Sequence, residues 1–236
     1  MRVFILVLVG VIVLGACDKA QENEIAQTNG VYKPNVKPED LSSTVDNKYF
    51  SLIPGRTLVY ESGEDGGERE VVEVLTEKKT VFGTEAVVVR DRVYEEGELV
   101  EDTFDWFAQD KEGNVWYLGE DSQDIEDGVV VGNTGSWEAG VDGALPGIVM
   151  PADPKVGEEY KQEHYLGEAE DVAMVVSLKE TVDGITGTYK DCIKTLGWDP
   201  LSEFTKEYKY YCAEVGGVVL EEALESDEKV ELVEIR

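Results

Sequence analysis

Short runs in which apolar and polar residues alternate are the feature that most constrains how this chain folds. Alternation with a period of two places the apolar side chains on one face of a β-strand. Turns rich in Gly and Asp separate these runs at intervals of about ten residues, which is typical of antiparallel sandwiches, barrels and curved sheets. No long stretch has a persuasive helical period, so the pattern predicts a mainly β fold with a single antiparallel domain, either a curved sheet (half-barrel) or a sandwich. The strands are predicted at residues 56–63, 68–76, 79–82, 86–94, 98–109, 115–119, 159–165, 172–182, 189–197, 205–212, 217–223 and 229–235.

The first 16 residues differ from the rest of the chain, because Arg2 precedes an apolar run from Val3 to Leu14. This is the pattern of a secretory signal peptide, and the run is shorter than the roughly 20 apolar residues of a membrane-spanning helix. Residues 14–17, Leu-Gly-Ala-Cys, resemble the lipobox of bacterial lipoproteins. That resemblance implies cleavage before Cys17 and attachment of lipid, including an acyl chain such as palmitate, to this cysteine. The alternative is a plain signal peptide followed by a coincidental cysteine.

We therefore expect three parts: a signal peptide at 1–16, a lipidated cysteine with a flexible tether at 17–47, and the β domain at 48–236. The tether is predicted from its polar composition, its two prolines and the lack of an apolar period. As an alternative, Val31, Tyr32 and Val36 could pack on the domain as part of an extended arm. Lipidation would hold the exported protein in the cell envelope, on the periplasmic face or on the cell surface.

The negative net charge and the small numbers of histidine and cysteine residues exclude several classes of function. Acidic side chains outnumber basic ones by 51 to 21, and the formal net charge is -30. A protein of this charge repels phosphate, which excludes a nucleic-acid binder that works by phosphate neutralisation. One histidine and three cysteines exclude most zinc sites and most Ser-His or Cys-His catalytic arrangements. We interpret the single histidine, His164, as structural or exposed rather than as a catalyst or ligand.

Cys192 and Cys212 are predicted to form a disulfide, because an exported protein meets an oxidising compartment. If residues 189–197 and 205–212 form a hairpin, pairing the two cysteines places its centre at residue 202, within a segment of turn residues. The alternative is a pair of buried free thiols. Redox catalysis is disfavoured because the chain has no C-x-x-C motif.

Four residues around one predicted hairpin are candidate ligands for Ca²⁺: Asp102, Asp105, Asp110 and Asn114. Oxygen ligands suit this ion, but the spacing matches neither an EF-hand loop nor a nonapeptide calcium repeat. In so acidic a chain, such a cluster is also expected as a solvated face that serves salt adaptation or solubility. No other cofactor is expected.

A carboxylate-based hydrolase is a further hypothesis, because a glycosidase requires only two carboxylates held in a cleft. Asp102 and Asp105 lie beside Trp106, with Trp116 on the next run, and aromatic rings can stack on sugars. However, residues i and i+3 of one strand point to opposite faces, which disfavours this pair. We therefore expect a protein that is not an enzyme.

Residues 135–156 combine glycines and prolines with a cluster of apolar residues. The segment is too broken for a strand and too apolar to remain in solvent, so we expect a long ordered loop that lies over the sheet. Two roles stay open, a lid or ligand-binding loop and a plug that closes an otherwise open sheet. For an apolar ligand in a concave sheet, the candidate contacts are Trp106, Trp116, Leu145, Ile148 and Met150.

Several segments resemble a family of secreted bacterial proteins and lipoproteins of mainly β structure, over most of residues 49–222. The motifs are YFSLIPGRTLVY at 49–60, DWFAQD at 105–110, GNVWY at 113–117, PGIVMPA at 146–152 and KYY at 209–211. In that family an aromatic pair is followed by Ala-Pro-Gly-Val-Gly, whereas here Cys212, Ala213 and Glu214 follow Tyr211, which puts the local turn in doubt. The resemblance carries no catalytic residues. More distantly, the Pro-Gly-x-x-x-x-Tyr start at residue 54 is similar to that of the half-barrel lipoprotein carriers of the bacterial envelope, which implies a concave apolar face.

The sequence therefore predicts a lipid-anchored envelope protein that acts as a non-catalytic binding module, with an apolar ligand in a concave sheet. The alternative function is an acidic surface module that binds Ca²⁺ or a basic protein partner.

Overall fold

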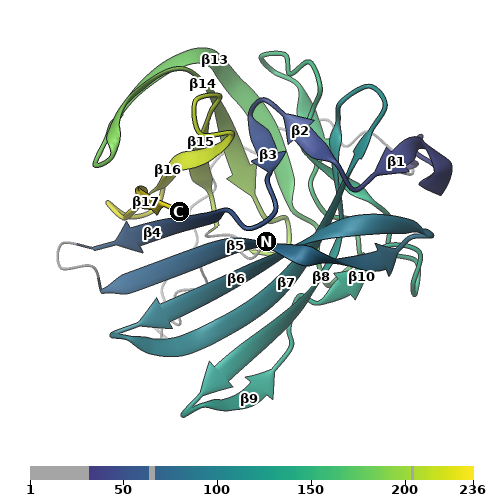
Figure 1. Ribbon diagram of the computed structural model, residues 1–236, viewed down its shortest axis with the longest axis horizontal. Coiled ribbons are helices and arrows are strands. Elements are labelled where there is room, and N and C mark those ends of the chain that lie inside the picture. Colours follow the sequence, from purple (N-terminus) through teal and green to yellow (C-terminus); the bar gives the residue numbers. More distant parts are fainter. Residues whose placement is uncertain (1–31, 64–66, 203–204) are drawn as a thin grey trace, which may run out of the picture.

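The structure, a computed structural model, describes residues 32–63, 67–202 and 205–236 (Figure 1). The predicted signal peptide, Cys17 and the first part of the tether lie outside the described residues. Within the described part of the chain, no helix has the length and hydropathy that a membrane crossing needs.

Strands dominate the chain, and a short 3-10 helix, η1 (Pro38–Asp40), precedes them. The early strands are β1 (Leu41–Ser42), β2 (Val45–Asn47), β3 (Phe50–Leu52), β4 (Thr57–Ser62), β5 (Glu68–Val81), β6 (Thr84–Glu95), β7 (Glu98–Asp110), β8 (Val115–Glu126) and β9 (Val129–Gly132). The later strands are β10 (Trp137–Glu138), β11 (Gly147–Met150), β12 (Glu159–Lys161), β13 (Val172–Gly184), β14 (Gly187–Trp198), β15 (Glu207–Cys212), β16 (Gly217–Ala223) and β17 (Lys229–Ile235).

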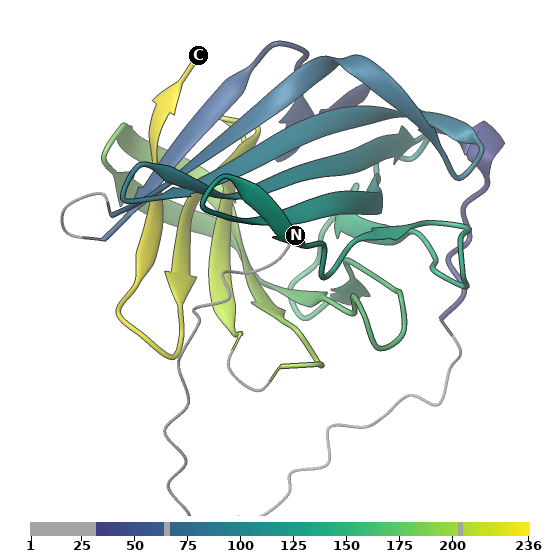
Figure 2. The same cartoon turned by 90° about the horizontal axis from the view of Figure 1, so that it is seen from below.

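One large antiparallel sheet contains most of these strands, in the order β10-β8-β7-β6-β5-β4-β17-β16-β15-β14-β13-β12. The sheet curves strongly, so that the strands β5 to β8 form one wall and β13 to β16 form another (Figures 1 and 2). The order begins at β10 and ends at β12, and the sheet is not closed into a barrel. The predicted mainly β fold with a single curved antiparallel sheet is therefore confirmed.

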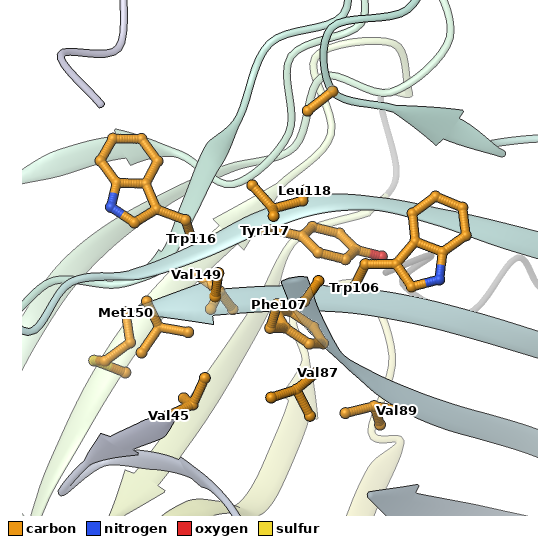
Figure 3. Close-up of a cluster of buried hydrophobic side chains, with 14 of the residues drawn as sticks. Val45, Val87, Val89, Trp106, Phe107, Trp116, Tyr117, Leu118, Val149 and Met150 are labelled. Carbon is orange, nitrogen blue, oxygen red and sulfur yellow. The ribbon is translucent and has the colours of Figure 1, made fainter. Parts of the chain in front are cut away.

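The register of the strands decides which side chains face the concave side. Directly opposed residues of antiparallel neighbours point to the same face. Phe107 of β7 is opposite Tyr117 of β8, and Ile193 of β14 is opposite Tyr211 of β15. The ring of Phe50 lies between the two walls, with its centroid 5.3 Å from that of Phe107 and 6.5 Å from that of Tyr211. These aromatic side chains therefore mark the concave face, and Figure 3 shows Phe107 and Tyr117 among its buried side chains.

Residues 32–52 form an arm that lies against the sheet, so the alternative of an extended arm describes the chain from residue 32. The hydroxyl of Tyr32 donates to the carbonyl of Pro146 at 2.8 Å, and Leu41 of β1 pairs with Asp110 of β7. Val45 of β2 is buried in the main core. Alternation over two or three residues cannot be distinguished from coil in a sequence, so the short strands of this arm were not predicted.

The segment 135–156, predicted to be a loop, contributes the short strands β10 and β11. Both pair with β8, so the segment covers the open side of the sheet beside that strand. The backbone N–H of Leu145 donates to the carbonyl of His164 at 2.9 Å, which links this segment to the chain just after β12. The segment is therefore ordered and lies on the sheet, as expected, and the choice between a ligand-binding loop and a plug stays a prediction.

A disulfide joins Cys192 of β14 to Cys212 of β15, as predicted. Ile193 is opposite Tyr211 and Thr195 is opposite Lys209, so the hairpin has its centre at residue 202, the register expected from the sequence.

Reduction of this disulfide should lower the free energy of unfolding by about 3 kcal/mol, because a loop of this length gains that much chain entropy in the unfolded state. Urea unfolding with and without dithiothreitol measures the change. The double variant Cys192→Ala/Cys212→Ala is the control, since dithiothreitol should leave its midpoint unchanged. An unchanged wild-type midpoint, once thiol titration confirms reduction, would contradict the prediction.

Candidate functional site

Ionisable side chains occupy the middle of the concave face, and we call them the inner carboxylate cluster. Its members are Glu70 (β5), Asp91 (β6), Asp105 (β7), Glu120 (β8), Glu207 (β15), Glu221 (β16) and, from the segment around β12, Glu163 and Asp171. The register places them on one face, since Asp105 is opposite Glu120, and Glu221 is opposite Lys209. In a sheet with charged residues only on its solvent-exposed face, apolar residues would occupy these positions on the concave face.

Tyr117 connects two carboxyl groups of this cluster. Its hydroxyl lies 2.5 Å from Oδ1 of Asp105 and within hydrogen-bonding distance of Oε2 of Glu120, and all three residues are buried. A phenol has one proton to donate, so two full hydrogen bonds require one of the carboxyl groups to carry a proton and donate it. Burial, together with the nearby Glu120 carboxylate, raises the pKa of Asp105 to about 7. The group therefore holds a proton close to neutral pH.

Glu70 and Asp91 form a second pair on the adjacent strands β5 and β6. Burial raises the pKa of Glu70 to about 7, and the carboxylate of Glu221 acts in the same direction. Burial and the neighbouring Glu70 raise the pKa of Asp91 well above its ordinary value. Oδ1 of Asp91 is buried and makes no hydrogen bond. Like Asp105, these carboxyl groups retain protons at a pH at which exposed ones are ionised.

Lys209 places a positive charge within the cluster. Its Nζ lies 3.0 Å from Oε1 of Glu207 and 3.2 Å from Oε1 of Glu221. Burial alone would lower the pKa of Lys209, but these two carboxylates raise it well above the ordinary value. Burial also raises the pKa of Glu207 to about 7, against the opposing effect of Lys209. Lys209 thus pairs with two carboxylates, and its charge also favours the ionised forms of Glu70 and Asp171.

A small cavity opens beside the cluster, between the two walls. It is lined by Phe107, Tyr117, Val149, Gln162, Glu163 and Asp171, and the surface that these residues expose to it is almost entirely apolar. Burial raises the pKa of Asp171 to about 8, and the carboxylate of Glu163 contributes to this shift. Burial also raises the pKa of Glu163. The cavity therefore has two carboxyl groups of high proton affinity in its wall.

Two buried polar atoms, on β10 and β12, have no hydrogen-bond partner of normal geometry. They are Nε1 of Trp137 and the hydroxyl of Tyr160, in side chains that are 4% and 9% exposed. Trp137 is opposite Glu120 in the sheet and meets the ring of Tyr117 edge-on, with centroids 5.4 Å apart. Its N–H makes no hydrogen bond of normal geometry, although it lies near enough to Glu163 to favour the ionised form of that carboxyl. Buried polar groups are normally paired, so these two atoms need an explanation.

Of the five residues predicted to contact an apolar ligand, the structure brings three onto one face of the sheet and places two elsewhere. Trp106 is opposite Val88, and Trp116 is opposite Ala108 and Ile148, on the face of the sheet away from Phe107 and Tyr117. The ring of Trp106 is covered by Lys79, whose Nζ lies 3.1 Å from its centroid. In Figure 3 the indoles of Trp106 and Trp116 extend in different directions and do not face each other. Met150 is opposite Val115 within the core, and Leu145 pairs with His164. Trp106, Trp116 and Ile148 therefore share one face of the sheet, Met150 and Leu145 lie apart from it, and the apolar ligand stays a prediction.

The four candidate Ca²⁺ ligands have separate structural partners. Both oxygens of Asp102 accept hydrogen bonds from Arg90 at 2.7 Å, on the convex face. Asp105 belongs to the inner cluster, so the two carboxylates considered for a hydrolase lie on opposite faces. Asp110 accepts from three backbone N–H groups of the following turn and from Nε1 of Trp116, and Asn114 bonds to Asp110. Among the described residues, no group of three or more His, Cys, Asp or Glu side chains is arranged to hold a metal ion.

His164 packs against the ring of Tyr32, with centroids 4.8 Å apart, and its pKa is lowered mainly by burial. The residues that form the inner cluster were not predicted as a site. A signal for some of them exists, because Glu207 and Lys209 occupy alternate positions of one strand in phase with buried Tyr211. A charged pair in the apolar phase of a strand indicates a polar interior.

Comparison with known proteins gives little further information. No family model matches the chain, and no curated protein matches it either. The resemblance to a family of secreted β-rich lipoproteins therefore stays a hypothesis. Among solved structures, the crystal structure of a "putative lipoprotein" from Parabacteroides distasonis is similar, with 13% identity and a TM-score of 0.44. The alignment covers 80% of this chain and 98% of that one.

Proposed function

We propose that this chain is a lipid-anchored envelope protein that binds a small polar molecule in the concave face of its sheet, without catalysing a reaction. The observation that supports this proposal is the inner carboxylate cluster. Burying carboxyl groups and leaving polar atoms unpaired is costly, and a sheet whose interior were purely structural would avoid both costs. Ionisable groups with strongly shifted pKa values, next to a cavity, are typical of functional sites.

The lining of the cavity changes the kind of ligand expected. An apolar ligand was predicted from tryptophans that lie on the other face of the sheet. The concave side instead combines the rings of Phe107 and Tyr117 with Gln162, Glu163 and Asp171. The polar side chains of Gln162, Glu163 and Asp171 at the cavity are the observation that favours a ligand with polar groups over a purely apolar one.

The proposed lipid anchor is based on the lipobox-like residues that precede Cys17. Such an anchor would hold the binding domain at a membrane. Two or more acyl chains hold a protein firmly on a bilayer, whereas one chain binds only marginally. The chain would thus bind its ligand within the envelope or at the cell surface, close to the membrane.

Mass spectrometry of the full chain, expressed with its leader and extracted from membranes in mild detergent, tests both parts. Under denaturing conditions we expect a chain that begins at Cys17 and carries the added mass of lipid, and the variant Cys17→Ser should lack this mass. Under native conditions we expect a small polar adduct that is lost on denaturation. An unmodified Cys17 would overturn the anchor, and a native mass without any adduct would count against the binding function.

A further inference from the structure

Strand β9 (Val129–Gly132) lies at an open edge of the sheet (Figure 1). It pairs with β8 on one side, and no other strand in the part of the chain that the structure describes pairs with it on the other side. Asp127 and Gly128, both with positive φ, form the two-residue turn between β8 and β9. This is the turn that joins tightly paired antiparallel strands, so the edge is held in place by a regular hairpin.

The register shows which backbone groups of β9 point outward. Glu126 is opposite Val129 at the two ends of the turn, where a two-residue hairpin forms a hydrogen-bonded pair. Hydrogen-bonded and non-hydrogen-bonded pairs alternate along antiparallel strands, so the next pair, Ile125 with Val130, is of the second kind. The N–H and C=O groups of Val130 therefore point away from β8, toward the position that a further strand would take.

The side chains of β9 are apolar and exposed. Val129, Val130 and Val131 are 62%, 54% and 56% exposed. Natural proteins commonly protect an exposed edge strand with lysine or proline, and β9 contains neither. An apolar strand with outward-pointing backbone groups is typical of edges that accept a strand from another chain.

The charge around β9 indicates what kind of strand this edge accepts. Residues 112–154, which include β8 and β9, contain nine acidic residues and no lysine, arginine or histidine. Glu126 and Asp127 at the hairpin turn are exposed, as is Asp121 on β8. A basic segment would be attracted to this region, whereas a second copy of the chain, with its net charge of -30, would be repelled.

We propose that β9 is a docking edge for an extended segment of a partner protein, in which basic and β-branched residues alternate. The segment adds as a strand beside β9 and pairs with the backbone of Val130. Its β-branched side chains lie on the face that carries Val130 and Ile125, and its basic side chains lie on the opposite face, which carries Glu126. This edge is separate from the cavity of the concave face, so the inference goes beyond the proposed function and does not depend on it.

Fluorescence anisotropy of the labelled peptide Lys-Val-Lys-Val-Lys-Val-Lys, titrated with the detergent-extracted full chain at physiological ionic strength, tests the proposal. We expect saturable binding. One control peptide is N-methylated at two adjacent central residues, which blocks both of its edges and keeps its charge, and the other has glutamate in place of lysine. Each control should bind at least about tenfold more weakly. No binding of the first peptide, or equal binding of either control, would overturn the proposal.

Two variants locate the binding on β9. Val130→Pro removes the outward N–H and leaves the pairing of Val129 with β8, so binding of the peptide should weaken by about tenfold or more. Val130→Lys should also weaken it, because it places a positive charge beside the basic peptide. Val156→Lys is the matched control, since Val156 is 63% exposed outside this edge and the change in charge is the same.

Circular dichroism checks that the variants are folded, and the comparison of the three peptides on the wild-type chain does not depend on any variant. An equal effect of Val156→Lys and Val130→Lys would overturn the proposal, because binding would then follow the overall charge alone. Native mass spectrometry gives a further test. A dimer of the chain that Val130→Lys dissociates would also overturn it, because a second copy would then occupy this edge.

Discussion

Replacing Gly147 by alanine should lower the free energy of unfolding by about 3 kcal/mol or more, a larger loss than most single substitutions cause. Gly147 is the first residue of β11, where the covering segment passes the chain after β12. A Cβ atom at this position would lie 1.9 Å from the carbonyl oxygen of Gln162 and 2.9 Å from the backbone nitrogen of Glu163. Backbone atoms cannot rotate away as a flexible side chain can, so the two segments must separate.

Thermal and urea unfolding followed by circular dichroism measure this loss. Gly67→Ala is the matched control, because Gly67 has no atom within 4 Å of an added Cβ and no left-handed backbone, so its variant should be close to the wild type. A Gly147→Ala variant as stable as Gly67→Ala would show that β11 and the segment after β12 do not touch in solution.

The protein should be markedly more stable at pH 5 than at pH 8, with a melting temperature lower by about 5 °C or more at the higher pH. Asp105, Glu70 and Glu207 have pKa values raised to about 7, and that of Asp171 is raised to about 8. Between the unfolded pKa, near 4, and these folded values, the folded state binds more protons than the unfolded state. The contribution of these four groups to the free energy of unfolding is therefore fully present below about pH 4. It is lost as the pH rises through 7 to 8.

Differential scanning calorimetry over this pH range gives the slope directly. Asp105→Asn keeps the shape of the side chain and removes one titrating group, so the melting temperature of this variant should fall less steeply with pH. Asp183→Asn, an exposed position on β13, is the control and should keep the wild-type slope. A melting temperature that rises from pH 5 to pH 8 would contradict the raised pKa values of Asp105, Glu70, Glu207 and Asp171.

Much of the fold could be predicted because the period of a strand is a local property. The runs at 217–223 and 229–235 coincide with β16 and β17, and the cysteine pair fixed the register of β14 and β15 correctly. The site could not be predicted because it depends on which of the two alternating sets of residues in each strand faces the concave side. At Trp106 and Phe107 both phases are aromatic and both are buried, so hydropathy does not distinguish them.

An irregularity in the pairing makes that choice harder still. Between Asp105 and Phe107, strand β7 is paired with residues 120 and 117 of β8, so β8 contains one more residue than β7 at this position. A bulge of this kind moves the apolar phase of one strand relative to the other. The sequence alone does not show it, and the convergence of Asp105, Tyr117 and Glu120 depends on it.

The arm of residues 32–52 determines how mechanical load from an anchored N-terminus enters the molecule. A pull at Tyr32 acts first on its single hydrogen bond to Pro146, and then on the two-residue pairing of β1 with β7. These contacts open one after another, so little force is needed at any moment. Strand β4, by contrast, is held along its length between β17 and β5. A pull from the proposed anchor should therefore extend only the first part of the arm, up to Val45, which is buried in the core.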